Sequence, residues 1–129
     1  MKLFSLEKAN ALIPVLEPLL RELWSKRTAL AIELLEHDPA LRPAGGRGTR
    51  LRPGQRGAPR RASELKAEIV RIVHRIEAYG CVIKDLNLGL LDFPALRDGR
   101  PVFLCWKAGE ESIDHWHAFD EGFAERKEL

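Results

Sequence analysis

The residues best suited to chemistry lie close together near the C-terminus, in the segment Asp114–Glu121 (Asp-His-Trp-His-Ala-Phe-Asp-Glu). Two of the four histidines in the chain and three carboxylates fall within these eight residues. Imidazole and carboxylate groups are common ligands of divalent metals such as zinc, manganese and iron. The segment therefore predicts a divalent-metal site, and a metal held there could activate water for hydrolysis.

The residues that share a face depend on the secondary structure of this segment. In a strand, His115 and His117 point to one face and Trp116 points to the other. In a helix, Asp114, His117 and Glu121 share a face. His117 belongs to the site in both cases, so it is the first expected ligand, and Glu121 and His115 follow.

Asp92 is the fourth expected ligand because it stands among apolar neighbours in Leu-Leu-Asp-Phe-Pro. A carboxylate in such a place needs a counter-charge, hydrogen bonds or a metal. Adjacent antiparallel strands could bring Asp92 and Cys105 near His117. The alternative is structural: the histidines pack beside tryptophan, Asp92 caps a turn, and Cys105 is an inert buried thiol.

Two predicted helices precede this region. Apolar residues recur at three- and four-residue steps over residues 6–36 and 63–79, which is typical of amphipathic helices. Ser5 and Ser63 are the expected N-caps, and Gly80 is expected to end the second helix in a left-handed conformation. Two helices joined by a loop favour an antiparallel hairpin.

The first helix has two unusual features. Pro14 and Pro18 lie inside it, which predicts either a kink or a division into two helices. It is also longer than the second helix, so part of its apolar face would stay uncovered. We therefore expect self-association through residues 6–36. Trp24 is either one contact of this interface or a partly buried core residue covered by the second helix.

Strands are expected after the second helix, because the apolar period changes to two. Three runs have this character: Cys81–Leu86, Leu90–Pro94 and Pro101–Lys107. Asp98-Gly99 predicts a tight hairpin turn between the last two runs. Pro94 and Pro101 suggest that pairing is interrupted near this turn or that they lie at an edge.

Together these elements predict an α+β fold, in which an antiparallel helical hairpin packs on a small antiparallel β-sheet. The sheet region is expected over residues 81–123, although the tail at 113–123 could be strand or helix. A chain of 129 residues is expected to form a single domain, residues 1–129.

The net charge of +2 conceals a block of seven arginines without an acid in residues 41–62. Five glycines and four prolines predict that residues 39–62 form a flexible loop. Its arginines could bind nucleic-acid phosphates without sequence selectivity: Arg47, Arg50, Arg52, Arg56, Arg60 and Arg61. The alternatives are a solvated insertion, or a contact with the acidic residues 108–129.

Some classes of protein are not expected. No apolar run approaches the roughly 20 residues of a membrane helix, and Glu7 and Lys8 come too early for a signal peptide. Two cysteines cannot make a disulfide framework, which favours a cytoplasmic protein. Three hypotheses remain: a metal-binding protein, with or without enzymatic activity; a helical interaction module without enzymatic activity; and a nucleic-acid-associated protein.

Six motifs occur in an order that is similar to a known family: Phe4–Pro14, Gly80–Leu86, Gly89–Gly99, Leu104–Trp106, His115–His117 and Glu121–Phe123. The chain resembles an uncharacterised bacterial family, the domain of unknown function 2203, over nearly its whole length except residues 39–62. The resemblance implies a small bacterial cytoplasmic protein and carries over no established activity. The Arg/Gly/Pro loop departs from the family pattern, in which the two helices are joined more compactly.

Overall fold

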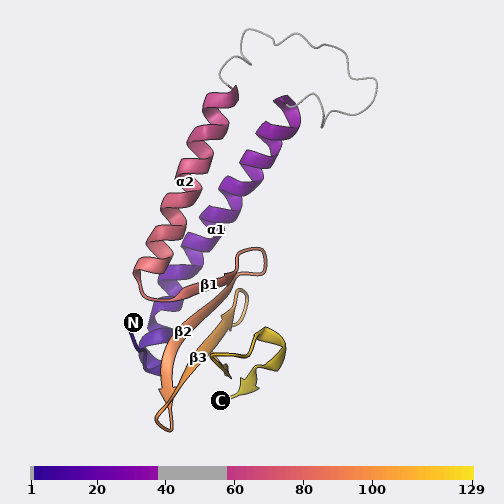
Figure 1. Cartoon of the computed structure of the whole chain (residues 1–129). Helices are drawn as coiled ribbons and strands as arrows, with labels where there is room; N and C mark the ends of the chain where they lie inside the picture. The colour runs from indigo at the N-terminus through magenta and orange to yellow at the C-terminus, as the bar shows by residue number, and fades with distance from the viewer. Residues whose placement is uncertain (1, 38–57) are drawn as a thin grey trace. The chain divides into compact units, whose positions relative to one another are not determined.

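The computed structural model describes residues 2–37 and 58–129. These residues form two α-helices, α1 (Leu6–His37) and α2 (Ala58–Ala78), followed by a five-stranded antiparallel sheet (Figure 1). The strands are β1 (Val82–Asp85), β2 (Leu90–Arg97), β3 (Arg100–Lys107), β4 (His115–Ala118) and β5 (Lys127–Glu128). Each strand pairs with the next one in the sequence. The predicted α+β fold is confirmed.

The chain divides into two compact units. We call Met1–Leu20 together with His74–Leu129 the sheet unit, and Arg21–Val73 the hairpin unit. Each helix contributes residues to both units. The prediction of a single domain stays a prediction.

The N-cap of α1 is as expected. The Lys8 N–H donates to the Ser5 hydroxyl at 3.1 Å, and the Ala9 N–H donates to the Ser5 carbonyl at 3.0 Å. Helix α1 continues through Pro14 and Pro18, so the alternative of two separate helices is wrong. Buried apolar residues lie on both sides of the prolines, and their packing outweighs the lost hydrogen bonds.

The start of α2 differs from the prediction. The helix begins at Ala58, five residues before the expected cap Ser63, so the C-terminal end of the predicted loop is wrong. Proline is tolerated in a first helical turn, so Pro59 does not prevent this start, and Ala62 is buried further along. The other end is as predicted, since Gly80 follows the helix with a φ of +104°.

The β2–β3 hairpin has the predicted turn. Asp98 and Gly99 both have positive φ angles, +51° and +78°, which is the signature of a type I′ turn. The two strands pair along all eight residues of each. Pairing is therefore continuous past Pro94 and Pro101, and the alternative of an interrupted hairpin is wrong.

Both prolines lie beyond the end of the neighbouring strand. Strand β1 pairs with β2 only as far as Asp92, and β4 pairs with β3 only as far as Val102. Pro94 and Pro101 therefore lie where no further strand pairs, so a missing N–H costs no ladder bond. The Pro94 carbonyl accepts the Phe4 N–H at 2.7 Å, so the N-terminal residues lie along this part of β2 (Figure 1).

The tail forms more sheet than expected. The strand interpretation is confirmed for β4, and a 3-10 helix, η3 (Phe123–Glu125), follows. Strand β5 then extends the sheet to Glu128, beyond the predicted end at residue 123. This strand has two residues, too few to leave a periodic pattern in the sequence.

Candidate metal centre

Three neighbouring strands place three potential metal ligands on one face of the sheet. Asp92 of β2 pairs with Cys105 of β3, so both side chains point to the same face. Cys105 pairs in turn with His115 of β4, and His117 lies two positions further along that strand on the same face. One potential ligand atom from each of Asp92, Cys105 and His117 lies within 4.8 Å of the others.

Strands β2 and β3 are apolar on the face opposite the cluster. Neighbouring positions along β2 and β3 point to the opposite face, where they are fully or almost fully buried: Leu91, Phe93, Leu104 and Trp106. Because these apolar side chains pack on one face of the sheet, Asp92 and Cys105 must point to the other face. The three side chains of the cluster are themselves no more than 2% exposed.

His117 is held by hydrogen-bond partners at both ring nitrogens. Its Nδ1 lies 2.8 Å from the carbonyl oxygen of Ala118, which can only accept, so Nδ1 carries the hydrogen. Its Nε2 lies 2.9 Å from Oδ2 of Asp92, so one proton lies between these two atoms. Without that proton, the lone pair of Nε2 would face the negative carboxylate of Asp92, and the two would repel each other. A cation bound between them would remove this repulsion. Metal-binding histidines are commonly oriented through the other ring nitrogen in this way.

Asp92 has one oxygen without a partner. Its Oδ1 is buried and has no N–H or O–H donor, although buried carboxylates normally satisfy both oxygens; the thiol of Cys105 also hydrogen-bonds to this carboxylate. Burial raises the pKa of Asp92, and the nearby His117, Cys105 and Lys84 oppose this rise only in part. An unpartnered carboxylate oxygen is thus available inside the cluster.

Cys105 is a protonated thiol at neutral pH in the absence of a metal. Burial, reinforced by the negative charge of Asp92, raises its pKa to about 12, against the opposing influence of Arg126. This is the reverse of the electropositive setting of a nucleophilic cysteine. A bound cation would change the balance, because metals hold cysteine as the thiolate.

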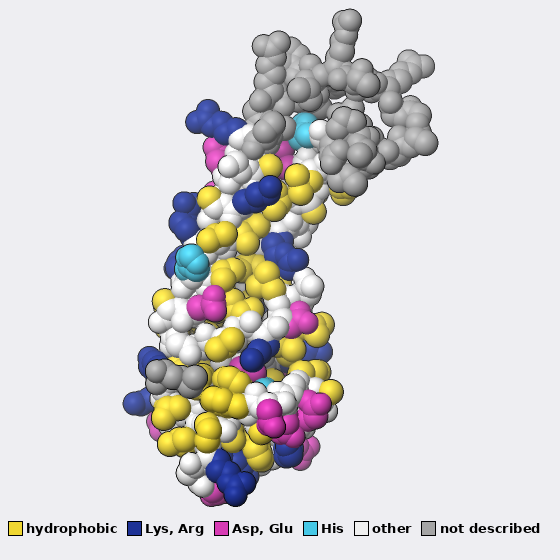
Figure 2. Space-filling view, viewed as in Figure 1, with side chains coloured by type: hydrophobic (Ala, Val, Ile, Leu, Met, Phe, Trp, Pro, Cys, Tyr) yellow, Lys and Arg dark blue, Asp and Glu magenta, His cyan; other side chains and the backbone are white. Residues whose placement is uncertain are grey.

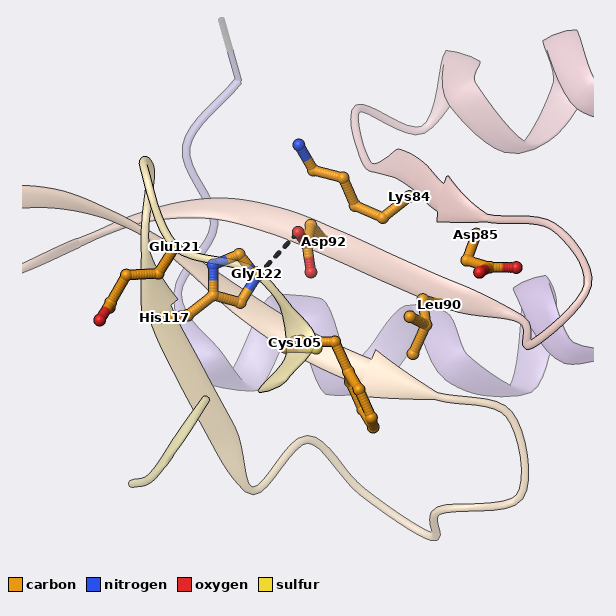
Figure 3. Close-up of a pocket in the computed structure, with 9 residues that line it drawn as sticks. Lys84, Asp85, Leu90, Asp92, Cys105, His117, Glu121 and Gly122 are labelled. Atoms are coloured by element: carbon orange, nitrogen blue, oxygen red, sulfur yellow. Dashed lines mark hydrogen bonds and ion pairs between the residues drawn. The ribbon is translucent and has the colours of Figure 1, made fainter. Parts of the chain in front are cut away.

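A cavity of about 290 Å³ lies against the cluster. Its lining includes residues from β1, β2, β3 and β4 and from the segment after β4 (Figure 3): Lys84, Asp85, Leu90, Asp92, Cys105, His117, Glu121, Gly122 and Phe123. The cluster is therefore buried within the protein but borders a space that a small molecule could fill.

His115 and Glu121 have other partners. Nδ1 of His115 lies 3.8 Å from Oε2 of Glu110. The Glu121 carboxylate accepts the Ala118 N–H at 2.8 Å and pairs with Lys127 at 2.7 Å. These hydrogen bonds, Lys127 first, lower the pKa of Glu121. Glu121 lines the cavity, but its carboxylate points away from the cluster (Figure 3).

Of the four ligands predicted from sequence, the structure thus brings Asp92 and His117 together and leaves His115 and Glu121 outside the cluster. The third member is Cys105, which sequence reasoning considered only as a possible neighbour. The hairpin turn contained the missing signal. A two-residue turn pairs Arg97 with Arg100. Five positions further from the turn on each strand, the same register pairs Asp92 with Cys105.

A second polar network holds the end of the chain against the sheet. The Glu110 carboxylate accepts the Lys107 N–H at 2.6 Å, and it pairs with Arg126 at 3.1 Å. The Arg126 guanidinium lies 4.3 Å from the ring centroid of Phe123. The same acid contacts His115, so this network borders the metal-ligand cluster.

The arginines predicted to bind nucleic acid are only partly described by the structure. Arg60 and Arg61 lie in the first turns of α2, where Glu64 pairs with them at 3.5 Å and 3.8 Å. The other four, Arg47, Arg50, Arg52 and Arg56, lie outside the described residues. Nucleic-acid association stays a prediction.

These features define a class: an α+β protein whose antiparallel sheet carries a buried cluster of aspartate, cysteine and histidine. The chain belongs to the family described as "Uncharacterized conserved protein (DUF2203)", whose model matches residues 2–129, so the resemblance in its motifs is confirmed at the level of the family. No protein of curated function and no solved structure matches it. No helix within the described residues is long and apolar enough to cross a membrane.

Proposed function

We propose that Asp92, Cys105 and His117 form a divalent-metal site, and that the metal is zinc. The observation that carries this proposal is the convergence of three different ligand types within 4.8 Å in a buried setting. The orientation of His117 and the unpartnered oxygen of Asp92 support it independently.

The donor set favours zinc over the other metals expected from the sequence. Thiolate and imidazole ligands suit zinc and iron, whereas manganese prefers oxygen ligands. Tetrahedral zinc would separate Nε2 of His117 and Oδ2 of Asp92 by about 3.3 Å, close to the 2.9 Å between these atoms in the structure. Two anionic ligands would also neutralise the dication, which lowers the cost of burying it.

Three protein ligands leave one tetrahedral position open. We propose that this position faces the cavity and holds a water molecule or a substrate atom. Metal-bound water has a lowered pKa and attacks esters, amides and phosphates, so hydrolysis is the activity that we propose for the site. A thiolate ligand must stay reduced, which agrees with the cytoplasmic location expected from the sequence.

The proposal is tested by metal binding to reduced, metal-free protein. We expect one equivalent of Zn²⁺ to bind and to raise the melting temperature, and Co²⁺ to give a sulfur-to-metal charge-transfer band. Cys105→Ser should remove the band, and His117→Gln should weaken Zn²⁺ binding by at least about tenfold. Cys81→Ser is the matched control, because Cys81 is also a free, buried thiol. A protein that binds no metal, or a Co²⁺ band that survives Cys105→Ser, would overturn the assignment.

We propose self-association as a second function, carried by the hairpin unit. An apolar groove of about 540 Å³ lies between α1 and α2, with Leu30, Leu34 and Ile69 among its walls. Exposed apolar residues lie on the same two helices, and Figure 2 shows hydrophobic side chains along them. Two of these exposed residues, Leu34 and Val70, also line the groove, so one surface offers both a groove and exposed apolar side chains, as a two-fold symmetric contact with a second copy requires.

Sedimentation measurements test this second proposal. Val70 lines the groove and is 51% exposed, and Leu88 is 47% exposed in the sheet unit. We expect the wild-type chain to dimerise at micromolar concentration, Val70→Glu to be monomeric, and Leu88→Glu to behave as the wild type. A wild-type chain that stays monomeric at high micromolar concentration excludes this role.

A further inference from the structure

Lys84 is a cation beside the cluster, close enough to lower the pKa of Asp92 but not paired with it. It lines the same cavity as Asp92 and His117, and among the described residues no carboxylate forms an ion pair with it. Its Nζ lies 4.7 Å from the ring centroid of Phe103, and that ring lies 5.5 Å from the imidazole of His117. The aromatic ring therefore holds the ammonium group next to the proposed metal ligands.

The two acids that line the cavity besides Asp92 are engaged elsewhere. Asp85 Oδ1 accepts the Leu88 N–H at 3.0 Å, and Lys127 neutralises Glu121. In Figure 3 both carboxylates point away from Asp92, whereas the Lys84 side chain extends over Asp92 toward His117. The charge that faces the open side of the cluster is therefore positive.

We propose that the metal site takes a small oxyanion, a carboxylate or a phosphate, which bridges the metal and Lys84. This inference rests on the proposed zinc site. Zn²⁺ with one carboxylate and one thiolate ligand has no net charge, so Lys84 supplies the charge that selects an anion. One ligand oxygen would occupy the open metal position, and a second would accept from the ammonium group.

The cavity limits the size of this ligand. Its volume of about 290 Å³ lies at the lower end of the range for ligand pockets. Leu90 and Phe123 supply apolar surface within it, which suits a short hydrocarbon substituent next to the anionic group. A compact carboxylate or phosphate ester fits these walls.

The test uses the full chain loaded with Co²⁺ and titrated separately with propionate and inorganic phosphate. The visible Co²⁺ spectrum reports a change in the metal's ligands and needs no activity. We expect at least one anion to shift the spectrum. Lys84→Met should weaken that anion roughly tenfold or more at unchanged metal content, and Lys84→Arg should restore most of the affinity.

Lys107→Met is the matched control, because Lys107 also lies near an aromatic ring, Phe123, at 5.7 Å, but does not line the cavity. A response to propionate alone assigns a carboxylate, and a response to phosphate alone assigns a phosphate. If Co²⁺ binds but neither anion shifts its spectrum, or Lys84→Met binds as the wild type, the oxyanion proposal is wrong and the metal site stands. If no metal binds, both proposals are wrong.

Discussion

The side chain of Asn10 accepts a hydrogen bond from the backbone N–H of Ile113 at 2.7 Å, across 103 positions of sequence. Asn10 lies in the second turn of α1, and Ile113 is buried just before β4 begins. This contact ties the start of the His117 strand to the helix. The position of one proposed ligand thus depends on a residue near the other end of the chain.

We expect Asn10→Ala to lower the free energy of unfolding by about 1–3 kcal/mol, because it leaves the Ile113 N–H buried without an acceptor. Urea denaturation measures this change. Asn10→Asp keeps an acceptor oxygen at the same position and should lose much less. Equal losses in the two variants would show that the hydrogen bond is not the cause.

The variant Asp92→Asn tests whether Asp92 is a metal ligand or only a structural residue. In metal-free protein the new amide can donate to Nε2 of His117 without burying a charge, so we expect unchanged stability or a gain of about 1 kcal/mol. The variant should also lose the rise in melting temperature that Zn²⁺ gives to the wild type. Denaturation with and without chelator measures both effects. A large loss of stability in the metal-free variant would favour a purely structural role for the pair.

Gly80→Ala should be more harmful than Gly109→Ala, although both glycines have nearly the same φ, +104° and +102°. A Cβ at Gly80 would lie 3.2 Å from Cζ of Phe4, whereas nothing lies within 4 Å of one at Gly109. Backbone strain alone should cost each variant about 1 kcal/mol. Phe4 cannot move easily, since it packs edge-on against Phe93 at 5.3 Å. Urea denaturation should therefore give the larger loss for Gly80→Ala, and equal losses would contradict this view of the contact.

Alkaline pH should destabilise the protein through Cys81. Burial raises the pKa of this thiol to about 11 in the folded state, from 9.0. Between these values the unfolded chain loses the proton and the folded chain keeps it, so the free energy of unfolding falls as pH rises. Cys81→Ser keeps a donor for the Ile76 carbonyl, which the thiol contacts at 3.5 Å, and it does not titrate in this range. Its loss of stability from pH 9 to 11 should be smaller by up to about 2 kcal/mol, and parallel curves would contradict the assignment.

Much of the fold was predictable because its signals are local. Ser5 marks the start of α1, Gly80 follows the end of α2, and Asp98-Gly99 forms the expected turn. The start of α2 was not predictable from the same signals. Proline and glycine nearby indicated a loop, while the burial of Ala62 depends on packing that the local sequence does not contain.

The site was predictable only in part, because some of its signals are local and others depend on strand pairing. Asp92 and His117 stand out as polar residues in apolar or aromatic surroundings. The choice of His117 over His115 depends on the register of β4 against β3. The chain between these strands, residues 108–114, has no two-residue turn that would set this register, so only the folded structure distinguishes the two histidines.

The register of the sheet also determines how the site could assemble. Asp92 and His117 are 25 positions apart, and Cys105 lies between them in the middle strand. The three side chains meet once three consecutive strands have paired, which requires closing only short loops. Residues 38–57 lie outside this stretch. Insertions between the helices can therefore accumulate during evolution without changing the spacing of the three side chains.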